Sequence, residues 1–189
     1  MSEALQFLGM PRESEDDFNL TLIRRQGSLL LGQKTRGYGA GLLVAPGGKT
    51  RYYVSPSGIG LLPSGMEAAR EASEESGLAI AADQLTQVGA LHIADEDDTK
   101  IIRLFQVAVE ADTSLVSTEF DAIDWYPEAD LPYEQMPKDY KLWLPSVLAG
   151  YAVTGFFETS NDVLVQARVF RSGIDGKTRA QEVDIPSLP

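Results

Sequence analysis

The segment Arg70–Leu78, which reads REASEESGL, carries one arginine and three glutamates within nine residues. On a helix of about 3.6 residues per turn, Glu71, Glu74 and Glu75 share one face because they stand at positions i, i+3 and i+4. Carboxylates at these spacings repel one another, so a compensating partner is expected. A hard divalent cation such as Mg²⁺ binds carboxylate oxygens and would offset the repulsion. The alternative interpretation is a solvated acidic helix face without a ligand.

The residues around this segment predict a helix with defined ends. Ser64 is a candidate N-cap, and Glu67 follows it at the spacing of a capping box. Gly77 stands where a C-cap glycine is expected. The stretch PSGMEAAREASEESG is therefore the clearest helix that the sequence predicts.

Strands are predicted on both sides of this helix from apolar runs and turn residues. Residues 18–34 predict two strands about a turn at Gln26 and Gly27, the stretch LLVA predicts a strand interior, and PSGIGLLPSG predicts a loop. After the helix, the sequence predicts strands at 85–94, 100–111 and 120–127, a second helix within 137–151, and a terminal hairpin over 153–170.

This order of elements predicts an α+β fold in which a mixed β-sheet is sandwiched between helices. The predicted domain covers residues 18–170. Residues 1–17 are polar and acidic and predict a loose arm, and residues 171–189 predict a polar, peripheral tail.

Composition narrows the possible functions. The 189 residues, 43% of them hydrophobic, suit one globular domain, and the absence of cysteine excludes disulfides and thiolate metal sites. A net charge of −12 argues against binding to a nucleic-acid polymer. The sequence shows neither a signal peptide nor an apolar run long enough to cross a membrane, so we expect a cytoplasmic protein without membrane association. It gives no indication of the oligomeric state.

The opening segment matches the second half of the Nudix box, which reads arginine, glutamate, apolar, any, glutamate, glutamate, any, glycine, apolar. Ala72 takes the first apolar position, and Gly77 and Leu78 take the last two. The chain thus resembles the Nudix hydrolases, and the resemblance implies the Nudix fold. The stretches LLLGQKTRGYGAG, GGK and DWYPEADLPYEQMPKDYKLWLP extend the likeness to the MutT-type oxidised-purine nucleoside triphosphatases (8-oxo-dGTPases), especially their mammalian branch.

The chain departs from the family pattern before the helix. Alignment on GGK makes Gly48 the opening glycine of the box and residues 50–62 an insertion, which is either a hairpin extension or a lid over the nucleotide. The first glutamate of the box is missing. Glu67 lies one turn before Glu71 on the same helix face, so we expect it to take over part of that role.

The resemblance implies a site for Mg²⁺ or Mn²⁺. Its ligands would be Glu71, Glu74 and Glu75, with one of the last two able to act as a general base. Arg70 would orient the glutamates through charge-assisted hydrogen bonds. A further carboxylate is expected just before Trp125, and the sequence leaves Glu119 and Asp121 as alternatives. The Gly47 carbonyl is a further candidate ligand, because a backbone without a side chain can approach an ion closely.

The same alignment implies residues that contact the nucleotide substrate. Lys34 matches a family lysine near the nucleotide, Val44 replaces a base-reading asparagine, and Asp139 is the remaining acid of a pair. Alternatively, Lys34 is an exposed cation at a strand end, and Asp139 is an acid favoured by the dipole of the second helix. Pro137 replaces the family's tryptophan. Trp125 and Trp143 are expected in the core, and His92 is expected to be structural.

The sequence supports one leading function and two alternatives. The leading hypothesis is a metal-dependent nucleoside triphosphate pyrophosphohydrolase that cleaves oxidised purine nucleotides such as 8-oxo-dGTP. The first alternative is hydrolysis of another nucleoside diphosphate derivative, either ADP-ribose or a nucleotide sugar. The second is a binding module with a decayed box, which the missing glutamate and the insertion favour.

Overall fold

The computed structural model describes residues 16–36, 39–50, 52–55, 58–61, 64–95, 98–110, 115–117, 119–160, 163–174 and 179–184. The strands before the first described helix are β1 (Asp16–Arg25), β2 (Ser28–Lys34), β3 (Leu43–Val44), β4 (Gly47–Lys49), β5 (Tyr52–Ser55) and β6 (Gly58–Leu61). The remaining strands are β7 (Thr86–Asp95), β8 (Asp98–Ala108), β9 (Phe120–Pro127), β10 (Tyr151–Ser160), β11 (Val163–Gly173) and β12 (Gln181–Glu182). The helices are α2 (Ser64–Ser76) and α3 (Tyr140–Leu148), with short 3-10 turns at Ala82–Gln84, Glu128–Asp130 and Tyr133–Gln135.

Ten of these strands form one mixed sheet. Its main path runs β12-β11-β10-β7-β8-β1-β2-β3, while β4 pairs with β1 and β9 pairs with β2. The pairs β1–β8 and β10–β7 are parallel, and the other pairs are antiparallel. The sheet thus brings together segments that are far apart in the sequence.

Strands β1 and β2 separate soon after the turn that joins them. They pair only where Arg24 and Arg25 face Leu29 and Ser28, next to Gln26 and Gly27. Farther from the turn, β1 pairs with β4 and β2 pairs with β3 and β9. This separation makes room for the loop between β2 and β4, and both pockets described below are built beside it.

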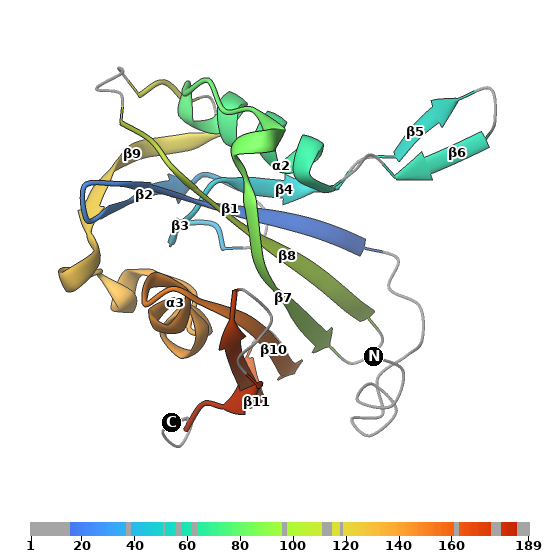
Figure 1. Ribbon diagram of the computed structural model, residues 1–189, viewed down its shortest axis with the longest axis vertical. Coiled ribbons are helices and arrows are strands. Elements are labelled where there is room, and N and C mark those ends of the chain that lie inside the picture. The colour runs from blue at the N-terminus through green and yellow to red at the C-terminus, as the bar shows by residue number, and fades with distance from the viewer. Residues whose placement is uncertain are drawn as a thin grey trace.

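The two helices lie on opposite faces of the sheet (Figure 1). Side chains alternate along β1, so Leu22 packs in the cluster that includes α3, while Ile23 packs in the cluster that includes α2. Both side chains are fully buried. The predicted sandwich of a mixed sheet between helices is therefore confirmed.

The boundaries differ from the prediction in three places. The segment predicted as a loop at PSGIGLLPSG contains β6, which pairs with β5 in a separate two-stranded sheet that extends from the body of the molecule (Figure 1). The described residues of the insertion thus pair with one another and not with the main sheet. Strand β1 begins at Asp16, before the predicted domain start, and β11 and β12 lie partly or wholly beyond residue 170. Cross-strand pairing overrides the turn propensity of the glycines here.

Neither α2 nor α3, nor any other helix in the described part of the chain, has the length and hydrophobicity needed to span a bilayer.

Candidate active site

Helix α2 is fixed against the sheet by its small residues. Ala68 and Ala72 are fully buried, and the Thr21 hydroxyl lies 3.5 Å from the Ala68 carbonyl oxygen. The helix ends at Gly77, which has a φ of 74° and donates its N–H to the Ser73 carbonyl oxygen at 2.9 Å. This is the left-handed C-cap that the sequence predicts. The acidic residues of the helix therefore have a defined position relative to β4.

An acidic pocket lies where α2 faces β4. It gathers side chains and backbone from the end of β2, from β4, from α2 and from the residue before β9. Its lining residues are Lys34, Gly47, Gly48, Lys49, Thr50, Glu71, Glu75 and Glu119. Five of the residues predicted from the sequence thus meet in one place: Lys34, Gly47, Glu71, Glu75 and Glu119.

Glu75 is the most buried carboxylate in this pocket, with 4% of its surface exposed. Its Oε2 accepts the N–H of Gly47 at 2.7 Å. The pKa of Glu75 is raised to about 7, mainly by burial and to a smaller extent by the carboxylates of Glu71 and Glu119, whereas the Gly47 N–H and Lys34 oppose the shift. The carboxylate form is therefore held in an unfavourable environment, which a bound cation would relieve.

Close contacts leave little room for a side chain at the two glycines of β4. A Cβ on Gly47 would lie 2.2 Å from the Asn19 carbonyl oxygen, and a Cβ on Gly48 would lie 3.0 Å from the Glu71 carboxylate. Gly48 faces Asn19 in the β1–β4 register. The absence of side chains at these positions allows the carboxylates of α2 to reach the backbone of β4.

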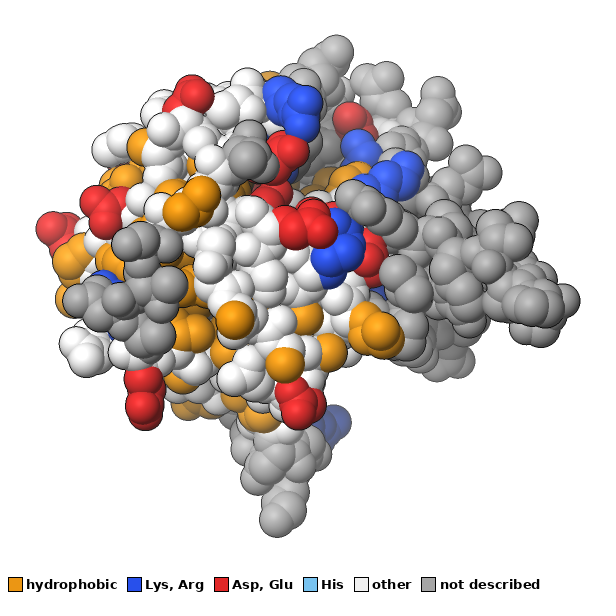
Figure 2. Space-filling view, turned by 90° about the horizontal axis from the view of Figure 1, so that it is seen from above, with side chains coloured by type: hydrophobic (Ala, Val, Ile, Leu, Met, Phe, Trp, Pro, Cys, Tyr) orange, Lys and Arg blue, Asp and Glu red, His pale blue; other side chains and the backbone are white. Residues whose placement is uncertain are grey.

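Arg70 holds three carboxylates of its own helix. Its Nε donates to Glu67 Oε1 at 2.8 Å, its Nη1 donates to Glu74 Oε2 at 2.6 Å, and its Nη2 contacts Glu71. The hydrogen bond that Arg70 donates to Glu67 raises the pKa of the Arg70 guanidinium above its ordinary value, against the opposing effect of burial. Contacts of this kind would orient the glutamates, which is the role that the resemblance implies for Arg70. Figure 2, which views the molecule from the α2 side, shows acidic side chains directly beside basic ones on this face.

Glu67 is the residue that the sequence indicates as a partial substitute for the missing first glutamate of the box. Only 1% of its surface is exposed, and both of its oxygens accept hydrogen bonds from Arg70, at 2.8 and 3.2 Å. Glu67 is thus the most buried of the three carboxylates that Arg70 contacts.

Glu74 and Asp121 lie differently from the other predicted ligands. The Glu74 side chain is 60% exposed, turns toward Arg70 and does not line the acidic pocket. Asp121 is exposed and also lies outside it, whereas Glu119 lines the pocket and forms an ion pair with Arg36 at 2.7 Å. Of the two alternatives before Trp125, Glu119 is therefore the one within reach of α2.

The donor atoms of the pocket fit a hydrated divalent cation. Within the described ranges, no three acidic or histidine side chains converge into a ready-made metal cage. The oxygens of Glu71, Glu75 and Glu119 nevertheless surround one pocket, and Thr50 contributes a buried Oγ1 with no hydrogen-bond partner. Mg²⁺ usually retains several waters and takes only a few protein oxygens. Glu71, Glu75 and Glu119 are thus the residues that could hold it.

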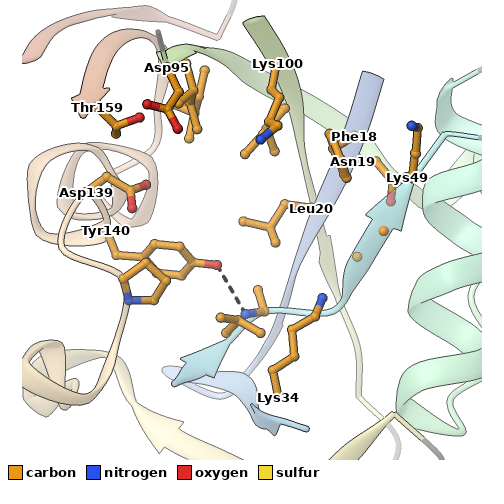
Figure 3. Close-up of a pocket in the computed structure, with 18 residues that line it drawn as sticks. Phe18, Asn19, Leu20, Lys34, Lys49, Asp95, Lys100, Asp139, Tyr140 and Thr159 are labelled. Atoms are coloured by element: carbon orange, nitrogen blue, oxygen red, sulfur yellow. Dashed lines mark hydrogen bonds between the residues drawn. The ribbon is translucent and has the colours of Figure 1, made fainter. Parts of the chain in front are cut away.

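A larger cavity of about 320 Å³ adjoins the acidic pocket and shares Lys34, Gly47, Gly48 and Lys49 with it (Figure 3). Its other lining residues come from β1, β3, β7, β8, β10 and the start of α3. They are Phe18, Asn19, Leu20, Val44, Ala45, Leu91, Ile93, Asp95, Lys100, Ile102, Pro137, Asp139, Tyr140 and Thr159. All three predicted substrate residues, Lys34, Val44 and Asp139, line this cavity.

Asp139 precedes α3 but makes no side-chain capping hydrogen bond. Its Oδ2 instead accepts the indole N–H of Trp143 at 2.8 Å. Burial raises the pKa of Asp139, and the Trp143 hydrogen bond opposes this shift. The Oη of Tyr140 accepts the N–H of Ala45 at 3.4 Å, which ties α3 to the segment between β3 and β4.

Asp95, Lys100 and Thr159 also line the cavity, and sequence reasoning did not identify them. They come from β7, β8 and β10, and Asp95 pairs with Thr159 through the parallel β7–β10 register. No motif marks these residues, because pairing between strands far apart in the sequence brings them together.

The residues expected to be structural do not themselves line the two pockets, although Trp143 donates its indole N–H to Asp139 at the wall of the cavity. Trp143 is fully buried in the cluster that includes α3, and Trp125 packs against the cluster that includes α2, with the Arg25 guanidinium 4.4 Å from its ring centroid. His92 stacks on Phe156 with ring centroids 5.1 Å apart. None of these aromatic rings lines the cavity.

The contrast between Glu67 and Glu74 leads to a prediction about stability. The Glu67→Gln substitution should lower the free energy of unfolding by about 1–3 kcal/mol, because it removes the charge that pairs with Arg70 in a buried setting. The matched substitution Glu74→Gln should change it by less than about 0.5 kcal/mol, since that pair is exposed. Urea unfolding of both variants measures the difference, and equal effects would contradict a special role for Glu67.

Comparison with known proteins gives relatives in sequence and in structure. No protein-family model matches the chain. The chain is 29% identical over 153 residues to an oxidized purine nucleoside triphosphate hydrolase from Danio rerio, a match that covers 79% of this chain and 91% of the relative.

Solved structures of low sequence identity share the fold. A MutT protein from Bacillus halodurans superposes with a TM-score of 0.65 at 21% identity, covering 82% of this chain and 97% of that one. A bifunctional NMN adenylyltransferase/ADP ribose pyrophosphatase from Francisella tularensis, solved with AMP and a manganese ion, gives a TM-score of 0.51 at 12% identity. That match covers 78% of this chain and 45% of the other.

Proposed function

We propose that this chain is a metal-dependent pyrophosphohydrolase of nucleoside triphosphates. It is MutT-like and Nudix-like in sequence and fold. Its preferred substrates are oxidised purine nucleotides such as 8-oxo-dGTP. The observation that carries the proposal is the shared wall between the acidic pocket and the larger cavity. One ligand can therefore place its phosphates beside Glu71 and Glu75 and the rest of its structure beside Val44 and Asp139.

The charges at the junction suit a polyphosphate. Lys34 and Lys49 line both pockets and supply cationic ammonium groups where the phosphates would lie. Because the whole chain carries a net charge of −12, local cations are needed to attract an anionic substrate. Glu71, Glu75 and Glu119 line the same acidic pocket and supply oxygen ligands beside these lysines.

The proposed reaction is attack of water on a phosphorus, which breaks a phosphoric anhydride bond and releases a nucleoside monophosphate and pyrophosphate. A divalent cation, when bound, neutralises phosphate charge and lowers the pKa of bound water. Glu71, Glu75 and Glu119 would hold that cation, and Glu75 is the better general base of the two candidates, because Glu74 points away from the pocket. Arg70 keeps Glu71 in place. Mg²⁺ and Mn²⁺ both suit these ligands, and manganese is present in the Francisella neighbour.

A second candidate function is hydrolysis of another nucleoside diphosphate derivative, such as ADP-ribose or a nucleotide sugar. Two positions where the resemblance places base-reading side chains are occupied by Val44 and Pro137, which carry no side-chain hydrogen-bonding group. The cavity therefore lacks part of the expected base-recognition set, which favours this alternative. The Francisella neighbour includes an ADP ribose pyrophosphatase.

A substrate panel tests the proposal and separates these functions. Wild-type protein is incubated with 8-oxo-dGTP, dGTP, ATP, ADP-ribose or UDP-glucose, with Mg²⁺ or with chelator, and release of pyrophosphate and monophosphate is measured. We expect metal-dependent pyrophosphate release that is fastest with 8-oxo-dGTP. Faster cleavage of ADP-ribose or UDP-glucose would support the second candidate. Nucleotide binding without turnover of any substrate would contradict both and support a decayed, binding-only module.

A further inference from the structure

The cavity next to the acidic pocket has polar groups on two opposite sides. Lys34 and Lys49 lie on the side that adjoins the acidic pocket, and Asp95 and Thr159 lie together across the cavity from Lys34 (Figure 3). The side chains between them are mainly aliphatic, among them Leu20. A ligand whose phosphates lie at the lysines would therefore place its far end beside Asp95 and Thr159.

The side with Asp95 offers hydrogen-bond acceptors. Asp95 Oδ1 is buried and has no hydrogen-bond partner among the described residues. The Thr159 hydroxyl donates its hydrogen toward the Ala94 carbonyl oxygen at 3.4 Å, which leaves its lone pairs as acceptors. Asp139, whose Oδ2 already accepts the Trp143 N–H, adds a second carboxylate to this side (Figure 3).

A buried carboxylate oxygen without a donor is unfavourable, and the cost is relieved when a donor is supplied. Val44 and Pro137, at the positions where the resemblance places base-reading side chains, cannot form side-chain hydrogen bonds with a ligand. Recognition of the ligand's far end therefore depends on other residues that line the cavity.

We propose that Asp95 is a specificity-determining residue, which accepts a hydrogen bond from the part of the substrate distal to the phosphates, with Thr159 as a second acceptor beside it. The inference rests on the proposed function, because it takes the acidic pocket as the phosphate end. The ligand chemistry is a head group that carries hydrogen-bond donors. Lys100 lines the same part of the cavity and can donate to a carbonyl oxygen of that group.

Two kinds of head group present such donors. Guanine offers only acceptors, N7 and O6, on its major-groove edge. Oxidation at C8 places a hydrogen on N7 and converts that acceptor into a donor, so an acceptor-lined cavity favours the oxidised base over guanine. The hydroxyls of a second sugar, as in ADP-ribose, are the other source.

The test compares wild type with Asp95→Leu, which removes both acceptors at similar volume, and Asp95→Asn, which keeps one acceptor. The first readout is the ratio of kcat/KM for 8-oxo-dGTP to that for dGTP, and kcat/KM for ADP-ribose. The second is the thermal shift produced by 8-oxo-dGMP, dGMP and ADP-ribose without metal, which requires no turnover. Asp83→Asn, at an exposed residue in a 3-10 turn, is the matched control.

We expect the 8-oxo-dGTP to dGTP ratio to fall about tenfold or more in Asp95→Leu and less in Asp95→Asn, with the control unchanged. A fall confined to ADP-ribose would support the same inference, with sugar hydroxyls as the donors. Ratios and thermal shifts that stay at wild-type values in a folded Asp95→Asn or Asp95→Leu variant would overturn it. If the wild type hydrolyses none of these substrates, the proposed function fails, and the thermal shifts alone then test the role of Asp95. Ligand stabilisation that depends on Asp95 would support that role. Stabilisation that is absent, or that is independent of Asp95, would overturn it.

Discussion

The Glu75→Gln substitution should abolish most of the activity and at the same time stabilise the metal-free protein at neutral and alkaline pH. Glutamine keeps an oxygen that can accept the Gly47 N–H, so the local structure should persist. It cannot ionise, so it neither supplies an anionic metal ligand nor accepts a proton from water. We expect kcat to fall by a factor on the order of 10²–10⁴, the range for loss of a general base. The rate of pyrophosphate release at saturating substrate measures this loss.

The gain in stability follows from the pKa of Glu75. Its pKa is raised from the model-peptide value of 4.5 to about 7 in the folded protein, mainly by burial. Below about pH 4.5 the carboxyl is protonated in both the folded and unfolded states, so wild type and variant should respond alike. Between about pH 4.5 and 7 the carboxyl ionises in the unfolded state but stays protonated in the folded state, so the stability of wild type relative to Glu75→Gln should decrease by about 1–3 kcal/mol and level off above about pH 7. Thermal unfolding between pH 4.5 and 8.5 in chelator measures the difference.

Two controls make this result specific. Glu158→Gln replaces an exposed glutamate on β10 and should change neither kcat nor the dependence of the melting temperature on pH. Added Mg²⁺ should reverse the order of stability at pH 8, because a ligand that binds only the folded wild type stabilises it. An active Glu75→Gln variant would contradict the assigned role of this residue, whatever its stability.

The Gly48→Ala substitution should lower kcat/KM by up to about 10-fold while leaving the protein folded. The new Cβ would lie 3.0 Å from the carboxylate of Glu71, a contact that displaces this flexible side chain slightly. Because a displacement of about 1 Å can cost about 10²-fold in rate, a smaller displacement should cost less. The affinity for Mn²⁺, measured by calorimetric titration, should fall together with kcat/KM.

Gly65→Ala is the matched control for this prediction. A Cβ at Gly65 would meet no atom within 4 Å, and alanine is the better helix former, so α2 should gain stability without any change in activity. Equal activity of Gly48→Ala and Gly65→Ala would show that the carboxylate of Glu71 need not approach β4.

Local sequence spacing was sufficient to predict helix α2. The i, i+3, i+4 pattern placed the glutamates on one helix, and Gly77 marked the end that the structure has at Ser76. The similarity to the Danio rerio hydrolase and the MutT fold confirms the resemblance to Nudix hydrolases that the REASEESGL segment indicates. Local patterns succeed here because the C-cap at Gly77 and the helix periodicity depend on residues that are close in sequence.

The position of single carboxylates was harder to predict. Glu74 shares a helix face with Glu71 and Glu75, yet it turns outward to Arg70 and does not line the pocket. Glu119 and Asp121 were equivalent alternatives in the sequence, and the structure distinguishes them because Glu119 lines the pocket and Asp121 does not. Orientations of this kind depend on packing between elements.

The far side of the cavity was not predictable from sequence patterns. Asp95 and Thr159 are neighbours only because β7 and β10 pair in parallel, and neither residue lies in a motif. The strand β6 was missed for a related reason, since a glycine-rich segment that predicts a loop is ordered by its pairing with β5. Long-range pairing determines both features, and single-sequence patterns do not report it.

The most direct test of the account is pyrophosphate release from 8-oxo-dGTP by the wild type and by Glu75→Gln, each with Mg²⁺ and with chelator. We predict pyrophosphate release by the wild type with Mg²⁺. We also predict that the rate of release falls by about 10²-fold or more both in chelator and in the variant. Equal rates for wild type and variant, or release that persists in chelator, would contradict the claim that the acidic pocket between α2 and β4 is a metal-dependent hydrolytic site.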